Sequence, residues 1–284
     1  MTVTQPRRLA LVHAHPDDES LWTGGTIARY VASGAEVMVI TCTLGEEGEI
    51  IPAELAQLRA QEADQLGGYR IGELRAALAE LGVTRHAFLG GPGRWRDSGM
   101  VGDPANEHPR SFVEGPVHHQ TGMLVEQLAE FRPQVLVSYD AYGGYGHPDH
   151  IRAHEITVAA APLLPDVERV FYAVQSSAAV RAGVAELVGW TDQPYRLPTD
   201  DDLAIVDDEL IGTALDVAEY VPAKLRALRA HATQVSVWES GERAVYALSN
   251  DIAAPVLPNE HFVLASGSPD GAAEDLFGGL EVRA

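Results

Sequence analysis

Short apolar segments alternate with helix-like segments through the first 175 residues, and this alternation limits the fold more than any other feature. Strand-like apolar runs occupy residues 9–14, 36–43, 85–89, 134–139 and 167–174. Helical apolar spacing occupies residues 20–32, 53–65, 71–81, 121–131 and 148–161. Because strands joined through helices run parallel with right-handed crossovers, we expect an α/β fold: a Rossmann-like open, mostly parallel sheet flanked by helices.

The pattern weakens after residue 175. Residues 176–188 and 218–231 look helical, 235–240 and 261–265 look strand-like, and 194–208 form a polar, acidic connection. We therefore expect a Rossmann-like core at residues 1–175 and a smaller C-terminal α/β portion at residues 176–284 that completes the substrate site. Residues 90–116 show little periodicity, and so long a loop within a compact domain is usually functional.

The charge balance narrows the classes of partner. The chain has 41 acidic and 20 basic residues, a formal charge of −21. Such a surface repels nucleic acid and anionic membranes, so we expect neither as a partner and favour a small neutral ligand. The alternative is that the acidity only favours solubility.

Two features favour a cytoplasmic protein without a membrane anchor. The single cysteine, Cys42, sits in an apolar run and is expected to be buried and inert, and no disulfide can form within the chain. The first eight residues lack the apolar core of a signal peptide, and no segment has the roughly 20 apolar residues that cross a bilayer.

Polar clusters follow the first and fourth predicted strands. The first cluster contains His15, Asp17 and Asp18, and the second contains His147, Asp149 and His150; both begin a helix near a proline. In an open α/β sheet, ligands bind beyond the carboxyl ends of the strands, where both clusters lie. Helix capping alone could explain the acidic residues, but two such clusters at one sheet edge favour a metal site.

The residue types predict how such a site would work. Two histidines and one carboxylate, here His15, Asp18 and His150, are a usual set for a catalytic zinc with an open position for water. Asp17 would remain free to take a proton from that water. His147 could stabilise the oxyanion, and Asp149 could orient His147 and raise its pKa.

Two further histidines lie near these clusters. His13 alternates with His15 along the predicted strand and is expected to be a structural neighbour. His154 follows His150 by one helical turn and is a rival metal ligand.

The two clusters resemble the LmbE-like family, also called the GlcNAc-PI de-N-acetylases, whose marks are a Pro-Asp-Asp motif and a His-Pro-Asp-His motif. Within that family the chain is most similar to the actinobacterial deacetylases of mycothiol biosynthesis. The segments that carry this resemblance are residues 41–49, 63–74, 93–100, 143–150 and 230–235. The resemblance spans nearly the whole chain and thins at about residues 176–215.

The resemblance implies a role for each matching residue. It implies one zinc per subunit on His15, Asp18 and His150, and Asp17 as the general base; the ligand set also tolerates Fe²⁺, which is the alternative metal. It implies His147 as stabiliser or general acid supported by Asp149, and Tyr145 as a mobile residue that polarises the substrate carbonyl. It implies that Arg70 and Asp97 hold sugar and inositol hydroxyls. We expect Glu46, Glu47 and Glu49 to form a solvated acidic loop rather than ligand contacts.

The activity implied is hydrolysis of the acetamide of 1D-myo-inositol 2-acetamido-2-deoxy-α-D-glucopyranoside, a small glycosyl-inositol. The alternative within the family is a mycothiol S-conjugate amidase with the same metal residues. Alternatives of other classes are a non-catalytic nucleotide-binding module, which lacks its Gly-rich turn here, and a zinc-stabilised binding protein. The sequence leaves open the oligomeric state and whether Asp17 alone or Asp17 with His147 moves the protons.

Overall fold

The computed structural model describes residues 5–241 and 243–283 and contains a seven-stranded sheet at its centre. Residues 1–4, part of the segment considered for a signal peptide, lie outside the described residues. Five parallel strands stand in the order β4-β3-β2-β5-β6, and β11 (Asn259–Ser266) and then β7 (Thr213–Asp216) follow β6. The bounds of the parallel strands are β2 Arg8–His13, β3 Glu36–Thr41, β4 Arg85–Phe88, β5 Val135–Ser138 and β6 Arg169–Val174. The predicted open, mostly parallel α/β sheet is therefore confirmed.

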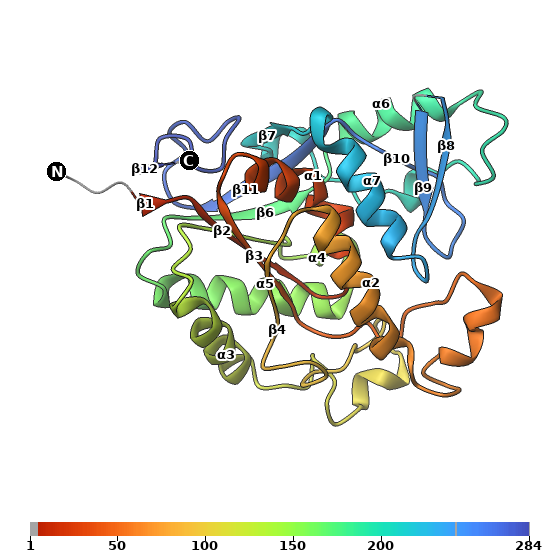
Figure 1. The fold of residues 1–284 in the computed structure, drawn as a ribbon, viewed down its shortest axis with the longest axis horizontal. Coiled ribbons are helices and arrows are strands. Elements are labelled where there is room, and N and C mark those ends of the chain that lie inside the picture. Colours follow the sequence, from red (N-terminus) through yellow and green to blue (C-terminus); the bar gives the residue numbers. More distant parts are fainter. Residues whose placement is uncertain (1–4, 242, 284) are drawn as a thin grey trace.

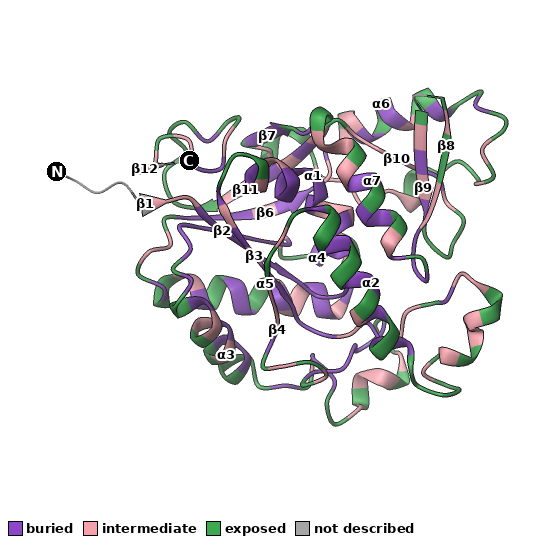
Figure 2. Ribbon diagram, in the orientation of Figure 1, coloured by how far each residue is buried: buried purple, intermediate pink, exposed green. Residues whose placement is uncertain are grey.

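Helices cover both faces of this sheet, which explains why its central strands are apolar throughout (Figure 1). Leu9 and Leu11 of β2 pack toward α1, α2 and α7, whereas Ala10 and Val12 pack toward α3 and α5. Figure 2 shows the resulting continuous burial of β2. The helices are α1 Asp18–Ala32, α2 Leu66–Glu80, α3 Val117–Ala129, α5 Pro148–Ala160 and α7 Val221–Ala230.

The portion after residue 176 contributes to the main sheet and also forms a small sheet. β11, Asn259–Ser266, pairs antiparallel with β6, and β7, Thr213–Asp216, pairs antiparallel with β11. β8 Ser236–Ser240, β9 Arg243–Ala247 and β10 Ala254–Pro255 form an antiparallel sheet beside α6, Ser177–Leu187. β1, Gln5–Pro6, pairs with β12, Val282–Arg283. The boundary near residue 175 stays a prediction about organisation, since one sheet takes strands from both sides of it.

The helix predicted at residues 53–65 is wrong in type and extent. Only a short 3₁₀ helix, η1 (Ala53–Leu58), forms there, and turns follow it before α2 begins at Leu66. No residue from 53 to 65 is buried, so this segment has no apolar face against the core to stabilise a longer helix. The strands β7 and β9 were not predicted, because their short segments carry little alternation.

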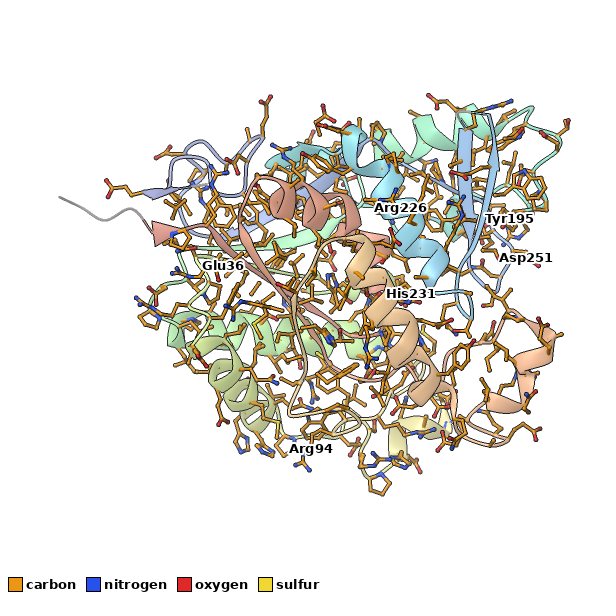
Figure 3. All side chains as sticks on the ribbon, in the orientation of Figure 1. Glu36, Arg94, Tyr195, Arg226, His231 and Asp251 are labelled. Atoms are coloured by element: carbon orange, nitrogen blue, oxygen red, sulfur yellow. The ribbon has the colours of Figure 1, made fainter. Side chains whose placement is uncertain are left out.

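The long loop at residues 90–116 crosses the carboxyl edge of the sheet and contains one 3₁₀ helix, η2 (Pro104–Glu107). α7 packs against both α1 and α2, and His231 follows its last turn (Figure 3). Both features bring segments that are distant in sequence to the ends of β2 and β5. Among the residues that the structure describes, no helix combines the length and the apolar character needed to span a membrane.

Candidate functional site

The parallel pairing of β2 with β5 brings the two polar clusters together. Leu9 pairs with Val135 and Leu11 pairs with Val137, so the two strands end at the same edge of the sheet. The chain then turns from β2 into α1 and, through the four-residue helix α4 (Gly143–Gly146), from β5 into α5. The predicted convergence of residues 15–18 with residues 147–150 is therefore observed.

His15, Asp18 and His150 form a nearly equilateral triangle of potential ligand atoms. His15 Nδ1 lies 3.4 Å from Asp18 Oδ2, and His150 Nε2 lies 3.4 Å from the same oxygen. The two ring nitrogens are 3.3 Å apart. Two ligands at about 2.0–2.1 Å from one tetrahedral zinc lie about 3.3–3.4 Å apart. The triangle therefore has the dimensions of one face of a tetrahedral zinc site.

The outward nitrogen of each histidine has its own acceptor. His150 Nδ1 lies 3.1 Å from the carbonyl oxygen of Gly143, and His15 Nε2 lies 3.2 Å from Asp149 Oδ2. Because these oxygens only accept hydrogen bonds, the outward nitrogens carry the protons in the neutral rings. The lone pairs of His15 Nδ1 and His150 Nε2 then face the centre of the triangle, as metal ligation requires.

The charges of this cluster shift the pKa values strongly. Burial acts to lower the pKa of His15, but the Asp97 charge and hydrogen bonds to Asp149 and Asp18 raise it well above its usual value. Burial acts to raise the pKa of Asp18, but His150 and His15 hold it well below its usual value. Without a cation, the cluster therefore favours a protonated His15 and an ionised Asp18.

Two other buried trios have ligand atoms within 4.8 Å of one another: His15 with His147 and His150, and His15 with Asp97 and Asp149. In the second trio, a metal would have to displace the proton that His15 Nε2 shares with Asp149. The residues therefore fit a metal, and in the triangle that includes Asp18 both rings keep their outward partners.

Asp17 adopts a backbone conformation that is rare for a residue other than glycine. Its φ is 119° and its ψ is −30° at the N-cap of α1. Its carboxylate Oδ2 lies 3.1 Å from Nη2 of Arg70. Burial raises the pKa of Asp17 to about 6, although Arg70 acts to lower it. Asp17 thus has a proton affinity suited to a base near neutral pH.

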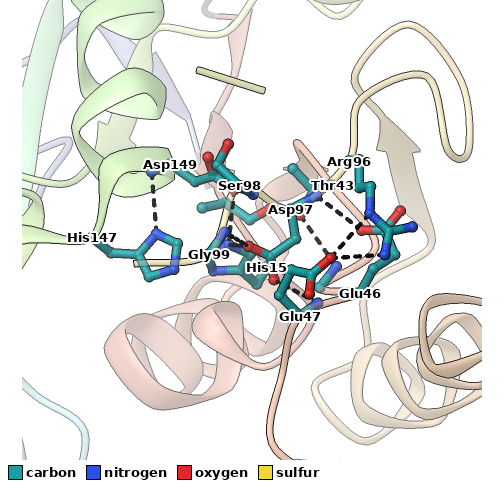
Figure 4. A network of polar contacts seen from close by, with 12 residues as sticks. His15, Thr43, Glu46, Glu47, Arg96, Asp97, Ser98, Gly99, His147 and Asp149 are labelled. Carbon is teal, nitrogen blue, oxygen red and sulfur yellow. Dashed lines mark hydrogen bonds and ion pairs between the residues drawn. The ribbon is translucent and has the colours of Figure 1, made fainter. Parts of the chain in front are cut away.

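The predicted support of His147 by the Asp149 carboxylate is wrong. That carboxylate contacts His15 instead, and also accepts the Ser98 backbone N–H at 3.0 Å (Figure 4). His147 accepts the Asp149 backbone N–H at its Nδ1, 3.2 Å away, so it caps α5. Burial, followed by the rings of His15 and His150, lowers the pKa of His147 to about 3 instead of raising it.

Tyr145 lies over the two histidines of its own motif. Its ring is 4.9 Å from the His150 ring and 6.0 Å from the His147 ring, and the residue is 44% exposed. Gly144 beside it has φ 76° inside α4, a conformation that a residue with a side chain rarely adopts. Tyr145 therefore stands at the mouth of the site on a sharply turned backbone.

Arg70 and Asp97 both line the cavity, but the protein already uses much of their bonding capacity. Arg70 is 2% exposed, and it donates to the backbone carbonyls of Gly45 and Pro16 as well as to Asp17. Asp97 accepts the backbone N–H of Gly99 at 2.9 Å and lies 3.5 Å from His15 Nε2. Both residues therefore also organise the site.

The predicted solvated loop at Glu46 and Glu47 is wrong. Glu46 is buried and accepts the backbone N–H of Asp97 at 3.0 Å, and Glu47 forms an ion pair with Arg96 at 2.7 Å (Figure 4). Glu49 is exposed, as expected. These contacts hold the loop after β3 against the loop at residues 90–116. A count of charges in the sequence does not reveal such pairs between distant segments of the chain.

A cavity of about 640 Å³ extends from these residues into the C-terminal portion. The first motif and the second motif line it through His15, Asp17, Asp18, Tyr145 and His147. Its lining also includes Gln175, Tyr246, Asn250, Asn259 and His261. This volume lies within the range of about 300–1,000 Å³ that is typical of small-ligand sites.

The expectations for His13 and Cys42 are confirmed, whereas His154, the rival ligand, does not join the ligand atoms. His13 is fully buried with contacts to Tyr139 and Thr23, so it is structural. His154 lies 3.0 Å from the Tyr139 carbonyl oxygen and belongs to none of the three trios. Cys42 is buried, and burial raises the pKa of its thiol. Tyr139, which was not predicted, stacks on His150 at 4.1 Å; only its position at the end of β5 suggested it.

Comparisons with known proteins place the chain among deacetylases, the class of enzyme that the resemblance implied. The family model of the GlcNAc-PI de-N-acetylases matches residues 10–161. The 1D-myo-inositol 2-acetamido-2-deoxy-α-D-glucopyranoside deacetylase of Actinosynnema mirum is 63% identical over 281 residues, which cover 99% of each chain.

Solved structures resemble the chain in fold. A deacetylase of teicoplanin biosynthesis, solved with teicoplanin, has a TM-score of 0.54 at 19% identity, over 92% of this chain and 100% of that one. The 4-carboxy-2-hydroxymuconate hydratase of Pseudomonas putida has a TM-score of 0.58 at 16% identity, over 92% and 97%. Because a hydratase shares the fold, the fold alone does not identify the reaction.

Proposed function

Because the chain belongs to the GlcNAc-PI de-N-acetylase family, we propose that it hydrolyses the acetamide of 1D-myo-inositol 2-acetamido-2-deoxy-α-D-glucopyranoside, giving the free amine and acetate. The observation that carries this proposal is the triangle of His15, Asp18 and His150, with the Asp17 carboxylate beside it, at a cavity of small-ligand size that His15, Asp17 and Asp18 line. The near-complete coverage of a relative named for this reaction supports the substrate.

We infer that zinc is the resident metal and that His15, Asp18 and His150 hold it. The spacing of the three ligand atoms and the outward partners of both rings support this assignment. When bound, the metal would polarise the acetamide carbonyl and lower the pKa of a water molecule. Fe²⁺ tolerates the same ligand set and is the alternative metal.

Asp17 acts as the general base. Its carboxylate lines the cavity beside the ligand triangle, and the Arg70 guanidinium fixes one of its oxygens. A pKa of about 6 leaves it mostly ionised at neutral pH and able to release a captured proton to the leaving amine. The pKa of Asp17 and its contact with Arg70 therefore favour a mechanism in which this one carboxylate both accepts the proton and returns it.

His147 stabilises the oxyanion as a neutral donor. Its Nδ1 accepts a backbone N–H, so its other ring nitrogen, Nε2, carries the hydrogen. A lowered pKa keeps the ring neutral, and a cation on the neighbouring ligands would lower that pKa further. Tyr145, at the cavity mouth, supplies a second donor to the same oxygen. Asp149 acts through His15, whose ring it orients.

Arg70 and Asp97 hold the polyol in addition to their structural contacts, since both line the cavity beside Asp17. The C-terminal portion, residues 176–284, completes the substrate site through cavity-lining residues that include Tyr246, Asn250, Asn259 and His261. A neutral glycosyl-inositol suits a chain with a charge of −21, which would repel phosphorylated ligands. A single buried cysteine is compatible with the reducing cytoplasm as the location.

The test is acetate release from N-acetylglucosaminyl inositol by chain that has been stripped of metal and reloaded with Zn²⁺ or Fe²⁺. We expect no turnover without metal and turnover after loading. Asp18→Ala should lose the metal and the activity together, whereas the same change at Asp166, outside the cavity, should lose neither. A mycothiol S-conjugate measured in parallel separates the amidase alternative: faster cleavage of that conjugate than of the acetamide would refute the proposed substrate.

A further inference from the structure

A fully buried pair, Glu19 and His231, joins the start of α1 to the end of α7. His231 Nε2 lies 2.7 Å from Glu19 Oε1, and neither residue is exposed. The two residues are 212 positions apart in the chain. Figure 3 places His231 at the end of α7, next to α2. The pair therefore depends on the packing of the C-terminal portion against the first βα unit.

Glu19 holds the backbone of the proposed base. Its second oxygen, Oε2, accepts the backbone N–H of Asp17 at 3.0 Å. Asp17 has φ 119°, and such a conformation persists in a residue with a side chain only when its surroundings hold it. On the other side of the same residue, the Asp17 carbonyl accepts two N–H groups of the first turn of α1, from Ser20 and Leu21, each at 2.9 Å. The direction of the Asp17 carboxylate therefore depends on the Glu19 oxygen that accepts the Asp17 N–H.

His231 directs its side-chain hydrogen bonding to Glu19. Within the described residues, its other ring nitrogen, Nδ1, has no partner. Its backbone is fixed, because its carbonyl accepts the N–H groups of Gln234 and Val235 at 2.9 and 2.8 Å. The hydrogen-bonded turn that begins at His231 thus directs the Nε2 of His231 to the Glu19 carboxylate.

The same turn also supports the other partner of Asp17. Thr233 donates its backbone N–H and its hydroxyl to the two oxygens of Glu73, at 2.8 and 2.7 Å. Glu73 lies one helical turn after Arg70 on α2, and Arg70 forms the ion pair with the Asp17 carboxylate. The turn at residues 231–233 therefore contacts the supports of both the backbone and the side chain of Asp17.

We propose that His231 is a positioning residue for the reaction: through Glu19 it holds the strained backbone of Asp17, so that the carboxylate points at the metal site. This inference rests on the proposed function, in which Asp17 is the base. It assigns a role to the segment at residues 230–235, whose closeness to the first motif is decided by the fold.

A purely structural role for the pair makes a different prediction. A buried ion pair can be replaced by apolar side chains of similar volume with little loss of stability. The double variant Glu19→Met, His231→Leu removes both charges and leaves no acceptor for the Asp17 N–H. If the pair only fills the core, this variant should be as active as the natural chain.

The experiment measures kcat, KM, zinc content and Tm for four chains: the natural chain, the double variant, His231→Gln and Arg226→Leu. We expect the double variant to bind zinc and to lose about 100-fold in kcat, the size of effect that a misplaced catalytic group causes. KM should stay close to the natural value, because substrate binding does not use the pair. His231→Gln keeps a donor near the same place and should restore most of the kcat.

Arg226→Leu is the matched control. Arg226 also ties α7 to α2, through an exposed ion pair with Glu80 at 2.6 Å, and its loss should leave kcat unchanged. A folded double variant with the natural kcat would overturn the inference. If the double variant does not fold, Glu19→Gln decides, because its single acceptor oxygen must serve donors from Asp17, Ser20 and His231. Natural kcat in Glu19→Gln would then be the contrary result. An inactive natural chain would instead contradict the proposed function.

Discussion

Zinc binding at pH 7 should release about one proton from the metal-free chain. The charges of Asp97, Asp149 and Asp18 raise the pKa of His15 well above its usual value, so the free chain holds this proton at pH 7. In the proposed site, zinc would take the lone pair of Nδ1, while Nε2 would keep its hydrogen for Asp149. The Nδ1 proton must therefore leave when the metal binds.

The size and sign of the effect follow from this competition. A proton and zinc compete for one nitrogen, so zinc affinity rises with pH below the raised pKa of His15 and levels off above it. In the rising range, affinity should change about tenfold per pH unit, or about 1.4 kcal/mol. Isothermal titration calorimetry of the zinc-free chain, in buffers with different heats of ionisation, counts the protons released.

Variants at two aspartates sharpen this test. Asp149→Asn removes a charge that raises the pKa of His15, so fewer protons should be released, and zinc should bind about 10–100-fold more weakly. Asp166→Asn changes a carboxylate that pairs with Arg132 outside the cavity, so it should match the natural chain. Heats that do not depend on the buffer at pH 7 would refute the assignment of His15 as a ligand through Nδ1.

Four further outcomes follow from the structure. Asp17→Asn should keep its zinc but lose about 10²–10⁴-fold in kcat, measured as acetate release; a variant with natural kcat contradicts the base assignment. Arg70→Met removes the cation that lowers the pKa of Asp17, so the acidic limb of the kcat/KM profile should move to higher pH, and a shift to lower pH would show that Arg70 does not act on the base. Cys42 should resist alkylation at pH 8 in the folded chain and react after unfolding, as mass spectrometry can record, whereas rapid labelling of the folded chain would contradict its burial. Leu11→Ala, in the centre of the sheet, should lower the free energy of unfolding by about 2–5 kcal/mol in a denaturant titration, and a loss below 1 kcal/mol would show that the cavity collapses.

Local patterns were sufficient for the core of the fold. The five parallel strands were predicted because each is apolar over its whole length, and burial on both faces of a parallel sheet demands that composition. The segment at residues 53–65 failed for the complementary reason: it has helical composition, but the fold offers it no apolar surface to cover. β7 joins the sheet through pairing with β11, and the sequence of a four-residue segment is too short to predict such a pairing.

The sequence alone also indicated which residues meet at the candidate metal site. His15, Asp18 and His150 follow the ends of β2 and β5, and parallel pairing of these strands forces their carboxyl ends to one edge. Each motif follows an apolar run in the sequence, and both the run and the residue types are local properties, so these three residues could be proposed as ligands before their distances were known.

Only the tertiary structure decided the partners behind that triangle. Asp149 lies two residues from His147, yet its carboxylate contacts His15, because the first turn of α5 directs it across the sheet edge. Glu19 meets His231 because α7 packs on α1 and ends there. Such contacts depend on the packing angles of helices and the ends of loops, which no single segment of sequence contains. Local motifs therefore predicted the three candidate ligands, His15, Asp18 and His150. The residues that hydrogen-bond to them and neutralise their charges were decided by packing across the whole chain.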